Sequence, residues 1–118
     1  MSDSGTVISK TTWKFPPLSE KDFLSQVTQL ADIRHWHWVH LRPGMTRDSW
    51  RTPISGPLGK GFPDLMLVRG ERIVFMELKR AGAKPTPEQV EVLGILSGAA
   101  ETAVFTPLDW TEIERVLR

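Results

Sequence analysis

Three charged side chains stand within two short apolar runs, where the interior of a sheet would carry hydrocarbon. The stretch GFPDLMLVRGERIVFMELKR covers residues 61–80, with Asp64 in the first run and Glu77 and Lys79 in the second. Two carboxylates and an ammonium group at close range can hold a hard divalent cation and orient a water molecule. These three residues are therefore the first candidates for chemistry in this chain.

The polar break between the two runs predicts a β-hairpin that would bring the carboxylates together. Gly70 and Glu71 fit the centre of a two-residue turn. With that turn, Asp64 lies directly opposite Glu77, and Lys79 shares their face because side chains alternate along a strand. A slip of one residue in the register would separate them, so the prediction is a sharp one.

Placing two carboxylates side by side has an energetic consequence that favours a bound cation. At about 5 Å they repel by roughly 3 kcal/mol at an effective dielectric constant near 20, and burial adds a desolvation cost. A shared Mg²⁺ or Mn²⁺ ion would remove that repulsion. Two other interpretations stay open: Asp64 could cap a turn after Pro63, and Glu77 could pair with Lys79 or Arg80.

The segments around the hairpin predict the helices and strands that would hold it. Ser19 is expected to cap a first helix, with Glu20 in its first turn and bordering the inward stripe. Thr86 and Gln89 form a capping-box pattern that opens a second helix. The remaining expected elements are a strand at 35–41, a strand at 102–106 and a last helix at 109–117 capped by Asp109.

This order of elements, α, β, β, β, α, β, α, predicts an α/β fold with a mixed β-sheet flanked by helices, because a strand-helix-strand unit needs a parallel crossover. A chain of 118 residues suffices for one domain. We expect that domain at residues 18–118, preceded by a flexible N-terminal tail at residues 1–17 that is rich in Ser and Thr and ends in Pro-Pro. No apolar run suits a membrane helix or a secretion signal, so a cytoplasmic protein is expected.

Positive charge is concentrated in the part of the chain that carries the unusual carboxylates. The formal net charge is +1, but residues 42–84 hold nine basic and four acidic residues, whereas the remainder holds six basic and ten acidic ones. This asymmetry suggests a polyanionic partner facing that segment, although by itself it does not distinguish such a partner from a merely solvated surface. The candidates for contact with phosphates are Arg42, Arg47, Arg51, Lys60 and Lys84. The chain has no cysteine, so metal ligands would be oxygen or nitrogen atoms.

The combined motifs resemble those of a known superfamily. GFPDL, followed thirteen residues after Asp64 by the sequence ELK at residues 77–79 and then by TPEQ, is similar to the PD-(D/E)xK nuclease superfamily. Within it, the chain looks like a stand-alone virus-type replication-repair nuclease (VRR-NUC) domain from about Ser19 to the C-terminus. The resemblance implies a restriction-endonuclease-like core, Mg²⁺ as cofactor with Mn²⁺ able to substitute, and a host cell of a phage or a prokaryote.

The same resemblance assigns roles to the residues of the hairpin. Asp64 and Glu77 would be metal ligands, with the backbone carbonyl of Leu78 as a possible third. Lys79 would orient or activate the attacking water and stabilise negative charge on the phosphate.

Two helix residues also match the resemblance, and each has a plain structural explanation beside it. Gln89 matches the family's helix glutamine, but a capping box explains it fully. Glu20 matches the acid of the first helix, which would reach the metal directly or through water, but the helix dipole also favours an acid there. His35 and His37 match no catalytic position of the family.

By this resemblance the chain would be a structure-selective DNA endonuclease acting as a homodimer on branched DNA, in the manner of a Holliday-junction resolvase. The alternatives are a nuclease acting on flaps or ordinary duplex DNA, and a non-catalytic DNA-binding module on the same fold. No membrane partner and no small-molecule cofactor are expected.

Overall fold

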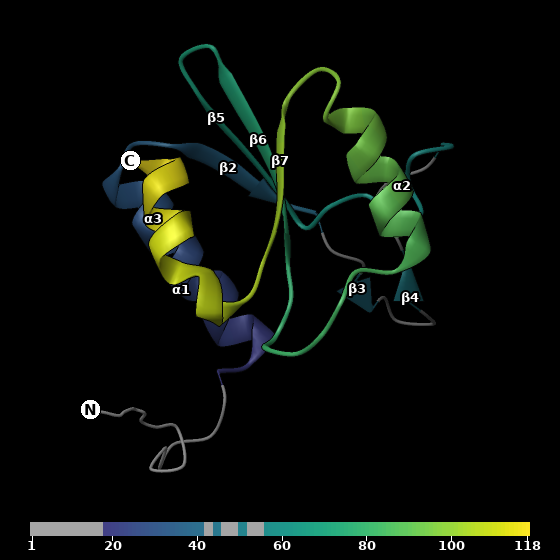
Figure 1. The fold of residues 1–118 in the computed structure, drawn as a ribbon, viewed down its shortest axis with the longest axis horizontal. Helices are drawn as coiled ribbons and strands as arrows, with labels where there is room; N and C mark the ends of the chain where they lie inside the picture. The colour runs from purple at the N-terminus through teal and green to yellow at the C-terminus, as the bar shows by residue number, and fades with distance from the viewer. Residues whose placement is uncertain (1–17, 42–43, 46–49, 52–55) are drawn as a thin grey trace, which may run out of the picture.

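A computed structural model describes residues 18–41, 44–45, 50–51 and 56–118 (Figure 1). The expected tail at residues 1–17 lies outside the described residues. The elements are α1 Glu20–Ile33, β2 His37–His40, β3 Gly44–Met45, β4 Trp50–Arg51, β5 Leu65–Arg69, β6 Arg72–Leu78, α2 Pro87–Leu96, β7 Glu101–Phe105, the 3-10 helix η2 Pro107–Asp109 and α3 Trp110–Leu117.

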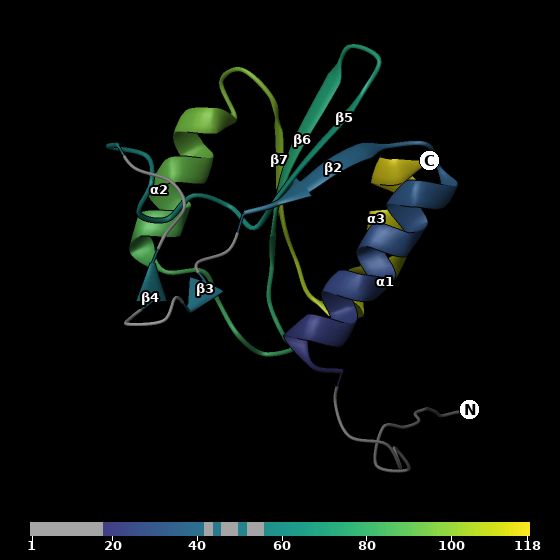
Figure 2. The same ribbon diagram turned by 180° about the vertical axis from the view of Figure 1, so that it is seen from behind.

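In the part of the chain that the structure describes, four strands form the main sheet in the order β2-β5-β6-β7. β2 and β6 run antiparallel to β5, whereas β7 runs parallel to β6 across the α2 crossover. α1 and α3 lie on one side of the sheet and α2 on the other, as both views show (Figures 1 and 2). The fold is therefore α/β with a mixed sheet, as expected, with the small β3-β4 pair and η2 as additions.

The hairpin has the register that the sequence predicts. Leu65 pairs with Met76 and Arg69 with Arg72, so the turn holds two residues, Gly70 and Glu71. Gly70 has φ +62°, a left-handed conformation that glycine adopts without a steric penalty.

The apolar core lies between the sheet and the pair α1 and α3. Alternate residues of the hairpin, Leu65, Leu67, Val74 and Met76, point toward this layer and are essentially inaccessible to solvent. They pack with core residues of the helices, strand ends and β7, namely Phe23, Val27, Ala31, Trp36, Leu78, Phe105, Ile113 and Leu117. The other residues of β6 face α2, so this strand is buried on both faces in its second half.

The end of α1 differs from the expectation of a strand at 35–41. His35 has φ +66° and follows the C-cap Arg34; the backbone N–H of His35 donates to Asp32 O at 3.1 Å and that of Trp36 to Ala31 O at 2.8 Å. This pair of bonds is a Schellman motif. The helix end thus takes two residues that the aromatic pattern assigned to the strand, which begins at His37.

The last helix also begins differently from the prediction. Asp109 precedes α3, but its carboxylate makes no cap bond to that helix. It accepts instead from the backbone N–H of Thr106 at 2.8 Å, which closes the preceding 3-10 turn. None of the described helices combines the length and the apolar character needed to cross a bilayer.

Trp36 and two arginines join the helix ends to the hairpin, at the opposite end of β6 from Glu77. The indole N–H of Trp36 donates to Leu117 O at 3.0 Å, and the guanidinium groups of Arg69 and Arg72 lie 4.4 and 5.0 Å from the Trp36 ring centroid. Arg69 also donates to Arg34 O at 2.8 Å. The arginines thereby place positive charge at the carbonyl ends of α1 and α3, where helix dipoles favour it.

The Schellman motif at His35 predicts a stabilising substitution. Because a side chain in the left-handed region costs roughly 1–2 kcal/mol, His35→Gly should raise the free energy of unfolding by about 1 kcal/mol. Urea denaturation followed by circular dichroism would measure it. The neighbouring change Arg34→Gly, at an ordinary C-cap residue, should not stabilise; equal effects of the two changes would contradict the motif.

Candidate active site

The candidate site forms where the start of β5, the end of β6 and the start of α2 meet. Asp64 lies one step beyond the Leu65–Met76 pair and therefore beside Glu77, and the two residues are 8% and 2% exposed. The backbone N–H of Leu78 donates to Asp64 Oδ2 at 3.1 Å. The hairpin register thus sets two carboxylates next to each other in a buried position, as the sequence predicts.

Gln89 belongs to both the helix cap and the site, so its two interpretations are not alternatives. Thr86 Oγ1 accepts from the Gln89 backbone N–H at 3.2 Å, and Gln89 Oε1 accepts from the Thr86 N–H at 2.8 Å. The other half of the same amide, Nε2, donates to Glu77 Oε2 at 2.8 Å. The capping box therefore fixes the amide in the orientation that binds the carboxylate.

The side-chain contacts to the Glu77 carboxylate that the described residues make both involve the same oxygen, Oε2. Lys79 Nζ lies 3.3 Å from Oε2, the same oxygen that Gln89 binds. The ion pair with Lys79 that the sequence left open is thus present, but it uses one oxygen. The second oxygen, Oε1, is buried and has no hydrogen-bond partner within the described residues. A buried unsatisfied carboxylate oxygen is costly, so a ligand for it is expected.

The environment of Glu77 disfavours its charged form. Burial and the neighbouring charge of Asp64 raise the pKa of Glu77, whereas Lys79 and the backbone of Asp64 lower it, and the pKa that results is about 7. A carboxyl group with this pKa exchanges its proton near neutral pH. When both carboxylates are ionised they repel each other, and a cation between them would remove that repulsion.

The donor atoms of the site fit a hard divalent cation in part. Two carboxylates and an unpartnered oxygen suit Mg²⁺ or Mn²⁺, which prefer oxygen ligands and retain several water molecules. Within the described residues, however, no group of three or more His, Cys, Asp or Glu side chains is arranged to hold a metal. The structure therefore does not bring Glu20 into a three-carboxylate site with Asp64 and Glu77. Any further ligands would be backbone carbonyls or water.

An aromatic pair packs beside Asp64. Phe62, two residues before the aspartate, meets Phe75 of β6 edge to face, with ring centroids 5.6 Å apart. Pro63 between them is fully buried. These contacts hold the loop against the α2 side of the sheet, and the only sequence signal for them is the apolar character of the residues.

The structure places the predicted phosphate-binding residues unevenly. Lys60 is exposed and lies 3.6 Å from Glu88 Oε2 at the start of α2, and Lys84 is exposed in the loop before α2. Both loops lead directly into the site. Arg51 lies in β4, whereas Arg42 and Arg47 are outside the described residues.

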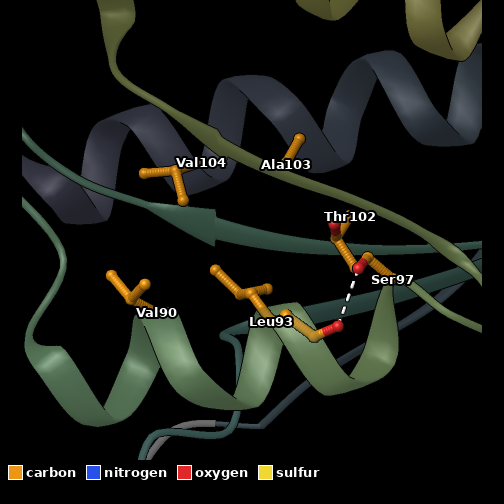
Figure 3. A pocket seen from close by; sticks show the side chains of 7 residues that line it. Val90, Leu93, Ser97, Thr102, Ala103 and Val104 are labelled. Atoms are coloured by element: carbon orange, nitrogen blue, oxygen red, sulfur yellow. Dashed lines mark hydrogen bonds between the residues drawn. The ribbon is translucent and has the colours of Figure 1, made fainter.

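An open groove of about 340 Å³ lies between α2 and β7, separate from the carboxylates (Figure 3). Ser97 Oγ donates to Gly94 O within α2, and most of the lining residues are apolar. The lining residues are Val90, Leu93, Gly94, Ser97, Thr102, Ala103 and Val104. Since it contains no ionisable side chain, this groove does not provide the chemistry that the carboxylate pair provides.

Comparison of the chain with protein-family models, with curated proteins and with solved structures yields no match. The interpretation of the site therefore depends on its geometry and chemistry.

The raised pKa of Glu77 predicts how stability depends on pH in the absence of metal. A carboxyl group that titrates near 4.5 when unfolded and near 7 when folded holds an extra proton in the folded state between these values, so stability falls as the pH rises through that window. Glu77→Gln cannot titrate. In EDTA, its stability relative to wild type should increase by about 1–3 kcal/mol between pH 4.5 and pH 7.5.

Thermal or urea unfolding at several pH values would measure this difference. Glu91→Gln, at an exposed position of α2, is the matched control and should show no such gain. Parallel pH profiles for wild type and Glu77→Gln would show that the carboxyl group is not destabilised by its burial.

Proposed function

We propose that this chain is a Mg²⁺-dependent DNA endonuclease of the PD-(D/E)xK type, with a restriction-endonuclease-like core that resembles a stand-alone VRR-NUC domain. The observation that carries the proposal is the buried Asp64–Glu77 pair beside Lys79, in which one Glu77 oxygen has no hydrogen-bond partner within the described residues. The Glu77–Lys79 ion pair does not by itself account for the second, buried oxygen of Glu77, which has no hydrogen-bond partner within the described residues. The match between this geometry and the sequence motif supports hydrolysis of phosphodiester bonds.

The protein's own residues would divide the work as follows. Asp64, Glu77 Oε1 and the carbonyl of Leu78 would hold the cation, which when bound supplies charge stabilisation and an activated water. Lys79, whose side chain is 15% exposed, can reach a phosphate oxygen or the attacking water while staying within 3.3 Å of Glu77. Gln89 keeps Glu77 Oε2 engaged, so that Oε1 is the oxygen available to the cation.

Proton exchange at Glu77 links metal binding to pH. Because the carboxylate must be ionised to bind a cation, and its pKa is about 7 without one, binding near neutral pH releases a proton. Metal affinity should accordingly weaken below pH 7. Glu20, the first residue of α1, does not complete a three-carboxylate group within the described residues, so its contact with a bound cation would run through a water molecule.

The substrate class rests on the charge distribution and on the resemblance. Basic side chains around the site would neutralise backbone phosphates and so bind DNA without reading its sequence. The resemblance favours branched DNA, where two copies of the chain in a homodimer would cut two strands of a roughly two-fold substrate. Flaps, ordinary duplex DNA and a purely DNA-binding role are the alternatives.

The decisive variant is Glu77→Ala. Cleavage of DNA in Mg²⁺ or Mn²⁺ should disappear, while binding measured by fluorescence anisotropy in Ca²⁺ should stay within a few-fold of wild type. Glu91→Ala, on the exposed side of α2, should cut normally. If wild type binds DNA but cuts no junction, flap or duplex in either metal, the chain is a binding module and not an enzyme. If wild type does cut DNA, comparing cleavage of a four-way junction with cleavage of its linear arms would identify the preferred substrate.

The predicted phosphate contacts can be tested through their salt dependence. Lys60→Ala and Lys84→Ala should each weaken binding to all DNA substrates to a similar degree and reduce the slope of log K against log salt by about 1. Lys21→Ala, on an exposed position of α1, is the matched control and should leave the slope unchanged. A loss of affinity confined to one DNA structure would contradict a simple phosphate contact.

A further inference from the structure

Gly61 lies where the loop before Asp64 touches the first turn of α2. Its φ is +93°, and a Cβ atom added to it would lie 2.6 Å from both the C and O atoms of Glu88 and 2.9 Å from the backbone N of Gln89. These three atoms belong to one peptide group. The loop and the helix thus meet backbone to backbone, at a distance that no side chain permits.

That same peptide group carries the contacts that orient Gln89. Its N–H donates to Thr86 Oγ1 in the capping box, and the side chain attached to it donates to Glu77 Oε2 at 2.8 Å. A methyl group at residue 61 would force the peptide back by about 0.8 Å to reach an ordinary contact distance. A hydrogen bond lengthened from 2.8 Å by that amount is no longer a hydrogen bond.

We infer that Gly61 is a positioning residue for Glu77, which acts through the Glu88–Gln89 peptide and the Gln89 side chain. The close approach sets how near α2 lies to the end of β6, and so decides which oxygen of Glu77 is bonded to the protein and which stays available. The importance of this role for a bound cation rests on the proposed function. The contact itself does not, because it exists in the metal-free protein.

A matched control separates this role from simple backbone strain. Gly82 has φ +86°, close to that of Gly61, but a Cβ atom there would have nothing within 4 Å. Gly82→Ala therefore introduces the same kind of left-handed strain without the clash. Any effect that Gly61→Ala shows beyond Gly82→Ala reports the contact with α2.

The first test is spectroscopic and uses the full chain without metal. The side-chain NH₂ resonances of Gln89, assigned by their loss in Gln89→Ala, should shift in Gly61→Ala toward the positions that they take in Glu77→Ala. They should stay in place in Gly82→Ala. Unmoved resonances in Gly61→Ala, or equal shifts in both glycine variants, would overturn the inference.

Wild type offers a check that does not depend on the folding of any variant. The close approach at Gly61 predicts a nuclear Overhauser effect between a Gly61 Hα and the backbone N–H of Gln89. Its absence from the spectrum of the folded chain would also overturn the inference.

The second test measures Mn²⁺ affinity by calorimetry. Gly61→Ala should weaken binding by about 3- to 10-fold, whereas Gly82→Ala should not. In a Gln89→Ala background, Gly61→Ala should cause no further loss, because both changes break the same contact. Independent, additive losses would show that Gly61 does not act through Gln89. If wild type binds no Mn²⁺, the proposed function fails, while the spectroscopic result on Gly61 stands by itself.

Discussion

The arrangement of this protein around α2 depends on one buried carboxylate. Glu77 lies at the end of a strand that is covered on both faces, and its charge is opposed by burial and by Asp64. Lys79 and Gln89 stabilise a single oxygen of this group. Among the described residues the other oxygen has no hydrogen-bond partner, and natural structures retain such a buried atom mainly where a ligand or a reaction uses it.

The first turn of α2 connects the parts of the molecule that this carboxylate requires. Its capping box satisfies the N-terminus of the helix and orients the Gln89 amide. Its backbone also contacts the loop at Gly61. The contact with Gly61 brings the aspartate loop and the helix to a fixed separation. The capping box at the N-terminus of α2 thus also sets the geometry of the charged site.

The two ends of the central strands have different tasks. At the hairpin end, Trp36, Arg69 and Arg72 join the carbonyl ends of α1 and α3 through stacking and hydrogen bonds. At the opposite end, the carboxylates of Asp64 and Glu77 lie side by side, and Glu77 Oε1 has no hydrogen-bond partner among the described residues. Because the two ends are separate, the hairpin end can stabilise the fold while the other end retains two neighbouring carboxylates that destabilise each other.

The sequence by itself determined the α/β class, the hairpin register, both helix caps at Ser19 and Thr86, and the proximity of Asp64 and Glu77, because each of these follows from local spacing and turn chemistry. Tertiary structure decided what local rules do not contain. It placed His35 and Trp36 in the turn that ends α1 and not in the strand, because the Trp36 indole is buried against Leu117 only if the chain turns there. It also decided that Gln89 caps and binds at once, that Oε1 of Glu77 lacks a partner among the described residues, and that Glu20 stays outside a shared carboxylate group, because these depend on distances between elements far apart in the chain.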